Sequence, residues 1–102
     1  MLEKSVERML RDGIKVRVPK ARCLKFVTPG FTGVPDRIIL LPGAETVFVE
    51  LKRPGQVERQ RQLFVQAGLR KLGFKVFSAV DSPEKVQEVI DYCGRCEGGG
   101  GA

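Results

Sequence analysis

Two short apolar runs joined by Pro42-Gly43 constrain this chain most strongly. The second run, Val47–Lys52, is rich in the β-branched and aromatic residues that favour strands. The first, Asp36–Leu41, follows Pro35, a residue that a strand tolerates at its start but not in its middle. The sequence therefore predicts a β-hairpin.

The register of this hairpin decides which charged side chains meet. A connection of three residues, 42–44, sets Asp36 directly across from Glu50, whereas an even connection sets Arg37 there. Because side chains alternate along a strand, Glu50 and Lys52 share one face and the apolar side chains between them share the other. We expect the odd register, or a bulge near Asp36.

Two carboxylates that face each other across strands lie roughly 5 Å apart and repel unless a positive charge lies between them. The chain has no histidine, and carboxylate, carbonyl and water ligands suit Mg²⁺ or Mn²⁺. Lys52 would point to the same place, and together these groups suit phosphodiester hydrolysis. By itself, Glu50-x-Lys52 is more commonly an exposed pair on a half-solvated strand.

Several segments together resemble the stand-alone VRR-NUC domains of the PD-(D/E)xK nuclease superfamily, over about residues 3–89. They are Gly33-Val34-Pro35-Asp36-Arg37, Leu41-Pro42-Gly43, Val49-Glu50-Leu51-Lys52-Arg53-Pro54-Gly55, Cys23-Leu24-Lys25-Phe26-Val27-x-Pro29-Gly30 and Gly73-Phe74-Lys75-Val76-Phe77. The resemblance implies a metal held by Asp36, Glu50 and the carbonyl of Leu51, with Lys52 assisting catalysis.

The family often adds a glutamate from the first helix to the metal site. Glu3 is the preferred candidate, since it lies nearer the centre of that helix's apolar stripe and precedes Leu10 by seven positions, a spacing similar to that of archaeal junction resolvases. Glu7 is the alternative. The resemblance also implies a glutamine on the helix that follows Lys52: Gln62 is ten positions on, while Gln60 and Gln66 stay open.

The remaining pattern predicts an α/β fold, a restriction endonuclease-like αβββαβ core of about four mixed strands flanked by helices, plus a C-terminal helix. The expected ranges are a helix over about 2–11 ended by Gly13, strands over 22–28 and 74–80, a glycine-rich loop over 29–33, and helices over 57–72 and from Ser82-Pro83 onward. In the middle helix, five residues form the expected broad apolar stripe: Leu63, Phe64, Val65, Ala67 and Leu72.

We expect one nuclease domain over residues 1–93 and a flexible glycine-rich tail over 94–102. Cys93-x-x-Cys96 has the spacing of half a zinc site, but only Cys23 remains to complete it, which argues against zinc. Three cysteines and the absence of an apolar run of about 20 residues indicate an intracellular, cytoplasmic protein without a membrane span. The family's brevity suggests a phage or mobile element as its source.

The formal net charge of +6 favours a polyanionic partner. Basic residues cluster on both sides of the hairpin in sequence: Lys15, Arg17, Lys20, Arg22 and Lys25 before it, and Arg53, Arg59, Arg61, Arg70 and Lys71 after it. The resulting hypothesis is an Mg²⁺- or Mn²⁺-dependent endonuclease that resolves Holliday junctions as a homodimer, the branched substrate and the dimer being implied by the resemblance. The alternatives are a nickase, a flap, restriction or repair nuclease, or an inactive DNA-binding module.

Overall fold

A computed structural model describes residues 3–53 and 55–100, and the side chains of residues 4–53 and 55–96. Its elements are α1 (Glu3–Arg17), β1 (Arg22–Lys25), β2 (Arg37–Leu41), β3 (Glu45–Leu51), α2 (Gln60–Lys71), β4 (Lys75–Val80) and α3 (Pro83–Gly100). The strands form one sheet in the order β1-β2-β3-β4, in which β4 is parallel to β3 and the other pairs are antiparallel. The predicted mixed α/β core is therefore confirmed.

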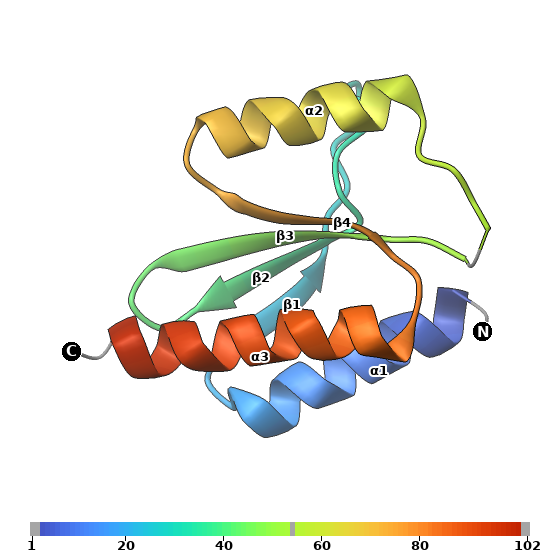
Figure 1. Ribbon diagram of the computed structural model, residues 1–102. Coiled ribbons are helices and arrows are strands. Elements are labelled where there is room, and N and C mark those ends of the chain that lie inside the picture. The colour runs from blue at the N-terminus through green and yellow to red at the C-terminus, as the bar shows by residue number, and fades with distance from the viewer. Residues whose placement is uncertain (1–2, 54, 101–102) are drawn as a thin grey trace.

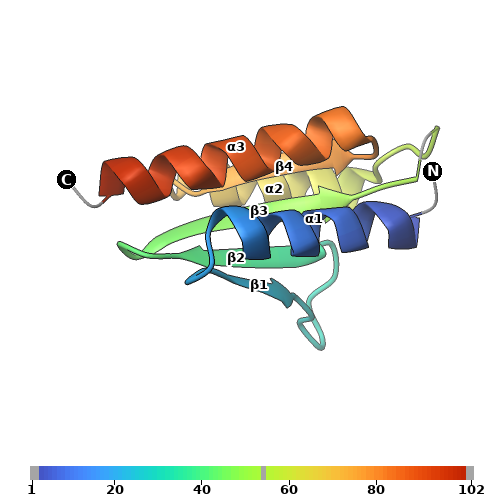
Figure 2. The same ribbon diagram turned by 90° about the horizontal axis from the view of Figure 1, so that it is seen from below.

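The helices lie on both faces of the sheet. Helices α1 and α3 cover one face and α2 covers the other, over the half formed by β3 and β4 (Figures 1 and 2). The side chains of Val47, Val49 and Leu51 point to α1 and α3 and are buried, as the alternation predicted. Ile39 and Leu41 of β2 extend this core, which the inward stripes of the two helices complete.

The hairpin has the odd register that places the two acids together. β2 ends at Leu41 and pairs it with Glu45, so the turn contains three residues, two of which, Gly43 and Ala44, have positive φ. The ladder pairs Arg37 with Val49. One further step sets Asp36 across from Glu50, as predicted.

The first helix is longer than expected, because Gly13 does not end it. α1 continues to Arg17, and Ile14 buries its side chain in the same core as Leu10. A Cβ atom added at Gly13 would lie 2.2 Å from Ile90 Cδ1 of α3. This glycine therefore permits the close approach of two helices, which is a different use from capping one.

The C-terminal helix was also underestimated. The serine cap is present, since Ser82 Oγ accepts a hydrogen bond from the Lys85 N–H at 3.3 Å, and the predicted inner face is buried. However, α3 continues through Gly94, which is buried against the Arg17 side chain, to Gly100, and Cys96 packs on the core. The predicted tail is thus wrong up to residue 100, and residues 101–102 lie outside the described residues.

Around the site, two element boundaries and the apolar face of α2 differ from the predicted ones. β1 ends at Lys25, although Phe26 N–H still donates to Asp36 O at 2.7 Å. α2 begins at Gln60, after Arg59 in an extended conformation, and Pro54, where we expected the preceding strand to break, lies outside the described residues. The expected stripe of α2 does not face inward, since Leu63 and Phe64 are 49% and 70% exposed.

We predict that Gly13→Ala destabilises the protein by roughly 1–3 kcal/mol in urea unfolding, because the new methyl group overpacks a buried contact with Ile90. Gly68→Ala is the matched control. Gly68 also lies inside a helix, but no atom approaches its added Cβ within 4 Å, so this change should stabilise by about 0.5–1 kcal/mol. Adding Ile90→Val, which removes Cδ1, should recover part of the loss; an equal loss with or without it would contradict the packing argument.

Candidate active site

Four polar side chains meet where the hairpin strands separate. Lys52 Nζ lies 2.9 Å from Glu50 Oε2 and donates to Gln62 Oε1 at 3.0 Å. Gln62 Nε2 in turn donates to Glu50 Oε2 at 2.5 Å. The structure therefore brings Glu50, Lys52 and Gln62 into one hydrogen-bonded triangle, with Asp36 beside it on the neighbouring strand.

Backbone groups hold the two carboxylates in place. Glu50 Oε1 accepts the Asp36 N–H at 3.1 Å, and Asp36 Oδ2 accepts the Leu51 N–H at 3.0 Å. Each acid thus binds the main chain of the opposite strand. These reciprocal bonds fix the orientation of both carboxylates without a bound ligand.

The site is buried more deeply than a half-solvated strand would allow. Glu50 is 1% exposed and Lys52 is 7% exposed. The pKa of Glu50 is raised to about 7, chiefly by burial and also by the charge of Asp36, while the hydrogen bond and charge of Lys52 oppose the rise. The common reading of Glu50-x-Lys52 as an exposed surface pair is therefore wrong.

The structure distinguishes the three candidate glutamines. Gln62 alone among them reaches Glu50 and Lys52 within the described residues, and its Oε1 also accepts the Arg59 N–H at 3.0 Å at the start of α2. Gln66 is fully buried and donates to Glu58, while Gln60 is exposed. One side chain thus both caps the helix and ties it to the site.

The two candidate glutamates of α1 are not both described by the structure. Glu7 forms an ion pair with Arg37, a buried residue that points to the opposite face of the sheet from Asp36. Glu3 is the first residue of α1, and its side chain lies outside the described residues. The burial of Arg37 was not predicted, although it follows from the odd register, which aims Asp36 at Glu50 and therefore turns Arg37 toward α1.

A β-bulge adjoins the site on β4. The pairing with β3 shifts between Val49 and Leu51, so that two residues of β4 lie opposite Glu50, and one of them, Ala79, has a φ of 53°. Glu58 Oε1 accepts the Ala79 N–H at 2.8 Å, and Lys85 Nζ donates to the Ala79 carbonyl at 3.2 Å. The extended segment before α2 therefore locks this bulge beside Glu50, a role that no local sequence pattern announced.

Arg61 connects α2 to the glycine-rich loop that precedes Asp36. Its Nε donates to Thr32 O at 3.1 Å, and its guanidinium lies 4.7 Å from the ring centre of Phe31. Gly33 has a φ of 90°, and a Cβ there would meet the Arg61 side chain at 2.7 Å and its carbonyl at 3.0 Å. The loop is therefore packed against the start of α2, and it leads through Pro35 directly into the acid.

The donor set fits a hard divalent cation in part. Asp36 and Glu50 supply carboxylate oxygens, and the partial protonation implied by the raised pKa of Glu50 is what a cation would replace. Among the described side chains, no three of the types His, Cys, Asp and Glu gather in one place, so the Leu51 carbonyl, water or Glu3 would complete the shell. Cys23, Cys93 and Cys96 are free thiols.

A mixed sheet with a paired acid, a Glu-x-Lys strand and a helix glutamine at the hairpin's end defines a nuclease of the restriction endonuclease-like class. The chain is 42% identical over 74 residues, 72% of its length and 77% of the other's, to "Putative nuclease p44" of Acyrthosiphon pisum secondary endosymbiont phage 1. A solved structure described as a VRR_NUC domain superposes with a TM-score of 0.78 at 25% identity, covering 88% of this chain and 95% of that one. No family model matches the sequence. The chain belongs to the VRR-NUC family of nucleases.

We predict that the metal-free protein loses stability as the pH rises from about 4.5 to about 7. The folded state binds the Glu50 proton more tightly than the unfolded state, whose reference pKa is 4.5, so the stabilisation is complete below that value and is lost through the folded pKa of about 7. The loss should be at most roughly 3 kcal/mol, since the pKa rises from 4.5 to about 7 and one pKa unit corresponds to about 1.4 kcal/mol. Urea unfolding in EDTA at pH 4 to 8 measures it. Glu50→Gln should flatten this component; an unchanged pH profile in that variant would show that another group causes it.

We predict that Glu58→Ala destabilises the protein by roughly 1–2 kcal/mol and slows cleavage, because the Ala79 N–H loses its charged acceptor. Glu58→Gln is the matched control, since its amide oxygen can accept the same hydrogen bond. Urea unfolding and single-turnover cleavage rates measure the two effects. Equal losses in the alanine and glutamine variants would mean that the charge of Glu58, and not its support of the bulge, is what the fold requires.

Proposed function

We propose that this protein is an Mg²⁺- or Mn²⁺-dependent endonuclease that hydrolyses DNA phosphodiesters and resolves Holliday junctions as a homodimer. The observation that carries the proposal is the hydrogen-bonded constellation of Asp36, Glu50, Lys52 and Gln62. In a family of nucleases, acidic oxygens beside a buried ammonium are the groups that metal-assisted hydrolysis needs.

Asp36, Glu50 and the Leu51 carbonyl would hold the cation, with Glu3 as a further ligand. A divalent ion held by these oxygens acidifies a bound water and offsets the charge that builds on the phosphate. The two acids are already oriented by the main chain of the opposite strand, so the carboxylates need little rearrangement. Such preorganisation is what makes an electrostatic site effective.

Lys52 acts on the substrate from the same face as Glu50. Its ammonium is restrained by Glu50 and Gln62, and it is positioned to orient the attacking water or to stabilise negative charge on the phosphate. Gln62 is a positioning residue in this scheme, because it contacts both charged groups. Loss of Gln62 would leave Lys52 with one restraint fewer in a buried environment.

The homodimer is supported by the number of sites and by an exposed surface. One such site cuts one strand, so two symmetric cuts require two subunits related by a twofold axis. The outward face of α2 exposes Leu63 and Phe64 at the helix whose first turn holds Gln62. Apolar contact at this face would bring two active sites together.

A phage or mobile-element origin is supported by the phage source of the related protein. Among the described residues, no helix combines the length and the apolar character that crossing a membrane requires. Neither the origin nor the membrane finding bears on the reaction that the site would catalyse. The branched substrate rests on the resemblance to stand-alone VRR-NUC domains.

We predict that the protein makes paired, symmetric cuts in a labelled four-way junction in Mg²⁺ or Mn²⁺ and makes none in EDTA. Lys52→Ala should lower the cleavage rate by at least about 100-fold, as loss of a charge-stabilising donor does. The matched control is Lys75→Ala, an exposed lysine at the start of β4, which should cleave like the wild type. A nick, a flap and a linear duplex of equal length serve as competing substrates.

Each result separates one alternative. Metal-dependent cutting of every substrate would replace the resolvase with a general nuclease, and single nicks from a monomer, identified by light scattering, would replace it with a nickase. Cutting confined to the flap would indicate a flap or repair nuclease. Binding without cutting under any metal would leave an inactive DNA-binding module and would overturn the catalytic proposal.

A further inference from the structure

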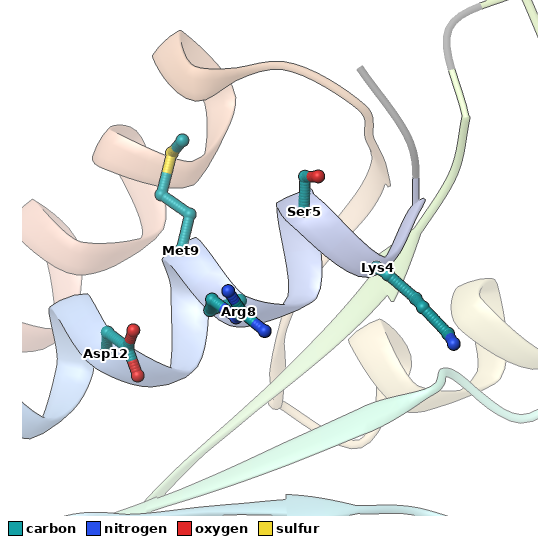
Figure 3. A pocket seen from close by; sticks show the side chains of 5 residues that line it. All are labelled: Lys4, Ser5, Arg8, Met9 and Asp12. Atoms are coloured by element: carbon teal, nitrogen blue, oxygen red, sulfur yellow. The ribbon is translucent and has the colours of Figure 1, made fainter.

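Four cations form a straight stripe along α1 that the active site does not use. Lys4, Arg8, Arg11 and Lys15 are spaced so that, at 100° per residue, all four fall within an arc of about 60°. All four are exposed, and they extend over about 16 Å of the helix at 1.5 Å per residue. Figure 3 shows Lys4 and Arg8 from close by, with Met9 pointing away from them toward α3.

The stripe borders a groove between α1 and the edge strand β1. One hollow of about 300 Å³ is lined by Lys4, Arg8 and Arg11 of the helix and by Lys25 of the strand. A second, of about 260 Å³, is also lined by Arg11 and continues past Lys15 to Arg22. The two hollows adjoin at Arg11, and together we call them the α1–β1 groove.

The groove carries almost uncompensated positive charge. Glu7 is the only acid among its described lining residues, and it is neutralised by the buried guanidinium of Arg37. Asp12 lies 3.9 Å from Arg11 Nε, but both side chains are more than half exposed, so this pair is weak. Six cations, Lys4, Arg8, Arg11, Lys15, Arg22 and Lys25, therefore face a partner with little internal competition.

One end of the groove lies at Lys25, across the β1–β2 ladder from the residue that follows Asp36. Lys25 pairs with Arg37 across the β1–β2 ladder, and Phe26, the next residue, donates its N–H to the carbonyl of Asp36. From there the groove follows β1 away from the site toward Arg22. Lys25 lies on the α1 face with Arg37, whereas the Asp36 carboxylate lies on the opposite face, so a polyanion bound at the site would reach the groove around the β1 edge of the sheet.

We propose that the α1–β1 groove binds the phosphodiester backbone of a DNA duplex arm that extends beyond the scissile phosphate. The stripe's length corresponds to about five nucleotides of axial rise at 3.4 Å each. The described lining residues include no aromatic side chain, whereas single-stranded DNA is usually held on aromatic stacking platforms. Contacts of this kind supply affinity and orientation without reading bases. The inference rests on the proposed action on DNA and identifies the part of the substrate that α1 holds.

The test measures DNA binding in EDTA by fluorescence anisotropy, so that it does not depend on cleavage. The double variant Arg8→Ala/Lys15→Ala should weaken binding to a junction with 16-bp arms by about tenfold or more near 0.1 M salt. The slope of log K against log salt should fall in magnitude by about 2, because each lost phosphate contact removes about 0.9. Arg95→Ala, an exposed helical arginine on α3, is the control and should change neither quantity.

Arm length provides the second readout. Shortening the arms from 16 to 5 bp should weaken binding by the wild type but have little effect on the double variant, whose groove no longer contributes. Equal salt slopes and equal arm-length effects in the wild type and the double variant would overturn the proposal. It would also be overturned if the double variant lost more affinity for polyglutamate or duplex RNA than for duplex DNA. If the double variant shows the expected loss of DNA binding but no metal supports DNA cleavage by the wild type, only the catalytic proposal is overturned. If the wild type cleaves DNA but the double variant has an unchanged salt slope, only the groove proposal is overturned.

Discussion

The register of the β2–β3 hairpin is the constraint on which the rest of this structure depends. A three-residue turn sets Asp36 across from Glu50 and, in the same step, turns Arg37 to the opposite face. One consequence is the paired acids; the other is a buried guanidinium that requires an anion from α1, which Glu7 provides. A slip of one residue would bury Asp36 beneath α1 and expose the apolar face, so the core and the site specify the same register.

The polar side chains on one face of β3 are stable in the folded protein because α2 supplies hydrogen-bond partners for them. Gln62 donates to Glu50 and accepts from Lys52, and its oxygen also caps the first turn of the helix. Helix α2 has few buried apolar side chains, since only Val65 and Gln66 are buried along it. Its position over the sheet therefore relies on polar contacts, including the bond from the preceding segment to Ala79. Fold and site share these interactions, so a change in one is expected to affect the other.

Much of this arrangement could be predicted from the sequence, and the failures have identifiable causes. Alternation and turn length were sufficient for the hairpin and for the pairing of Asp36 with Glu50, since both are local properties. Gln62 was accessible only through resemblance, because its role depends on how α2 crosses the sheet. Gly13 was taken for a helix end because its use, contact with Ile90, involves a residue 77 positions away. The bulge at Ala79 had no signal at all, since its acceptor comes from a distant, irregular segment.

The charges of the site explain why it should accept a cation from solution. Asp36 and Glu50 can carry two negative charges, and Lys52 supplies one positive charge within hydrogen-bonding distance of Glu50. The pKa of Glu50 is raised to about 7, chiefly by burial and also by the neighbouring charge of Asp36. A divalent ion held by Asp36 and Glu50 would favour the deprotonated form of Glu50. Lys52, on the same strand face as Glu50, would then supply a positive charge beside the phosphate.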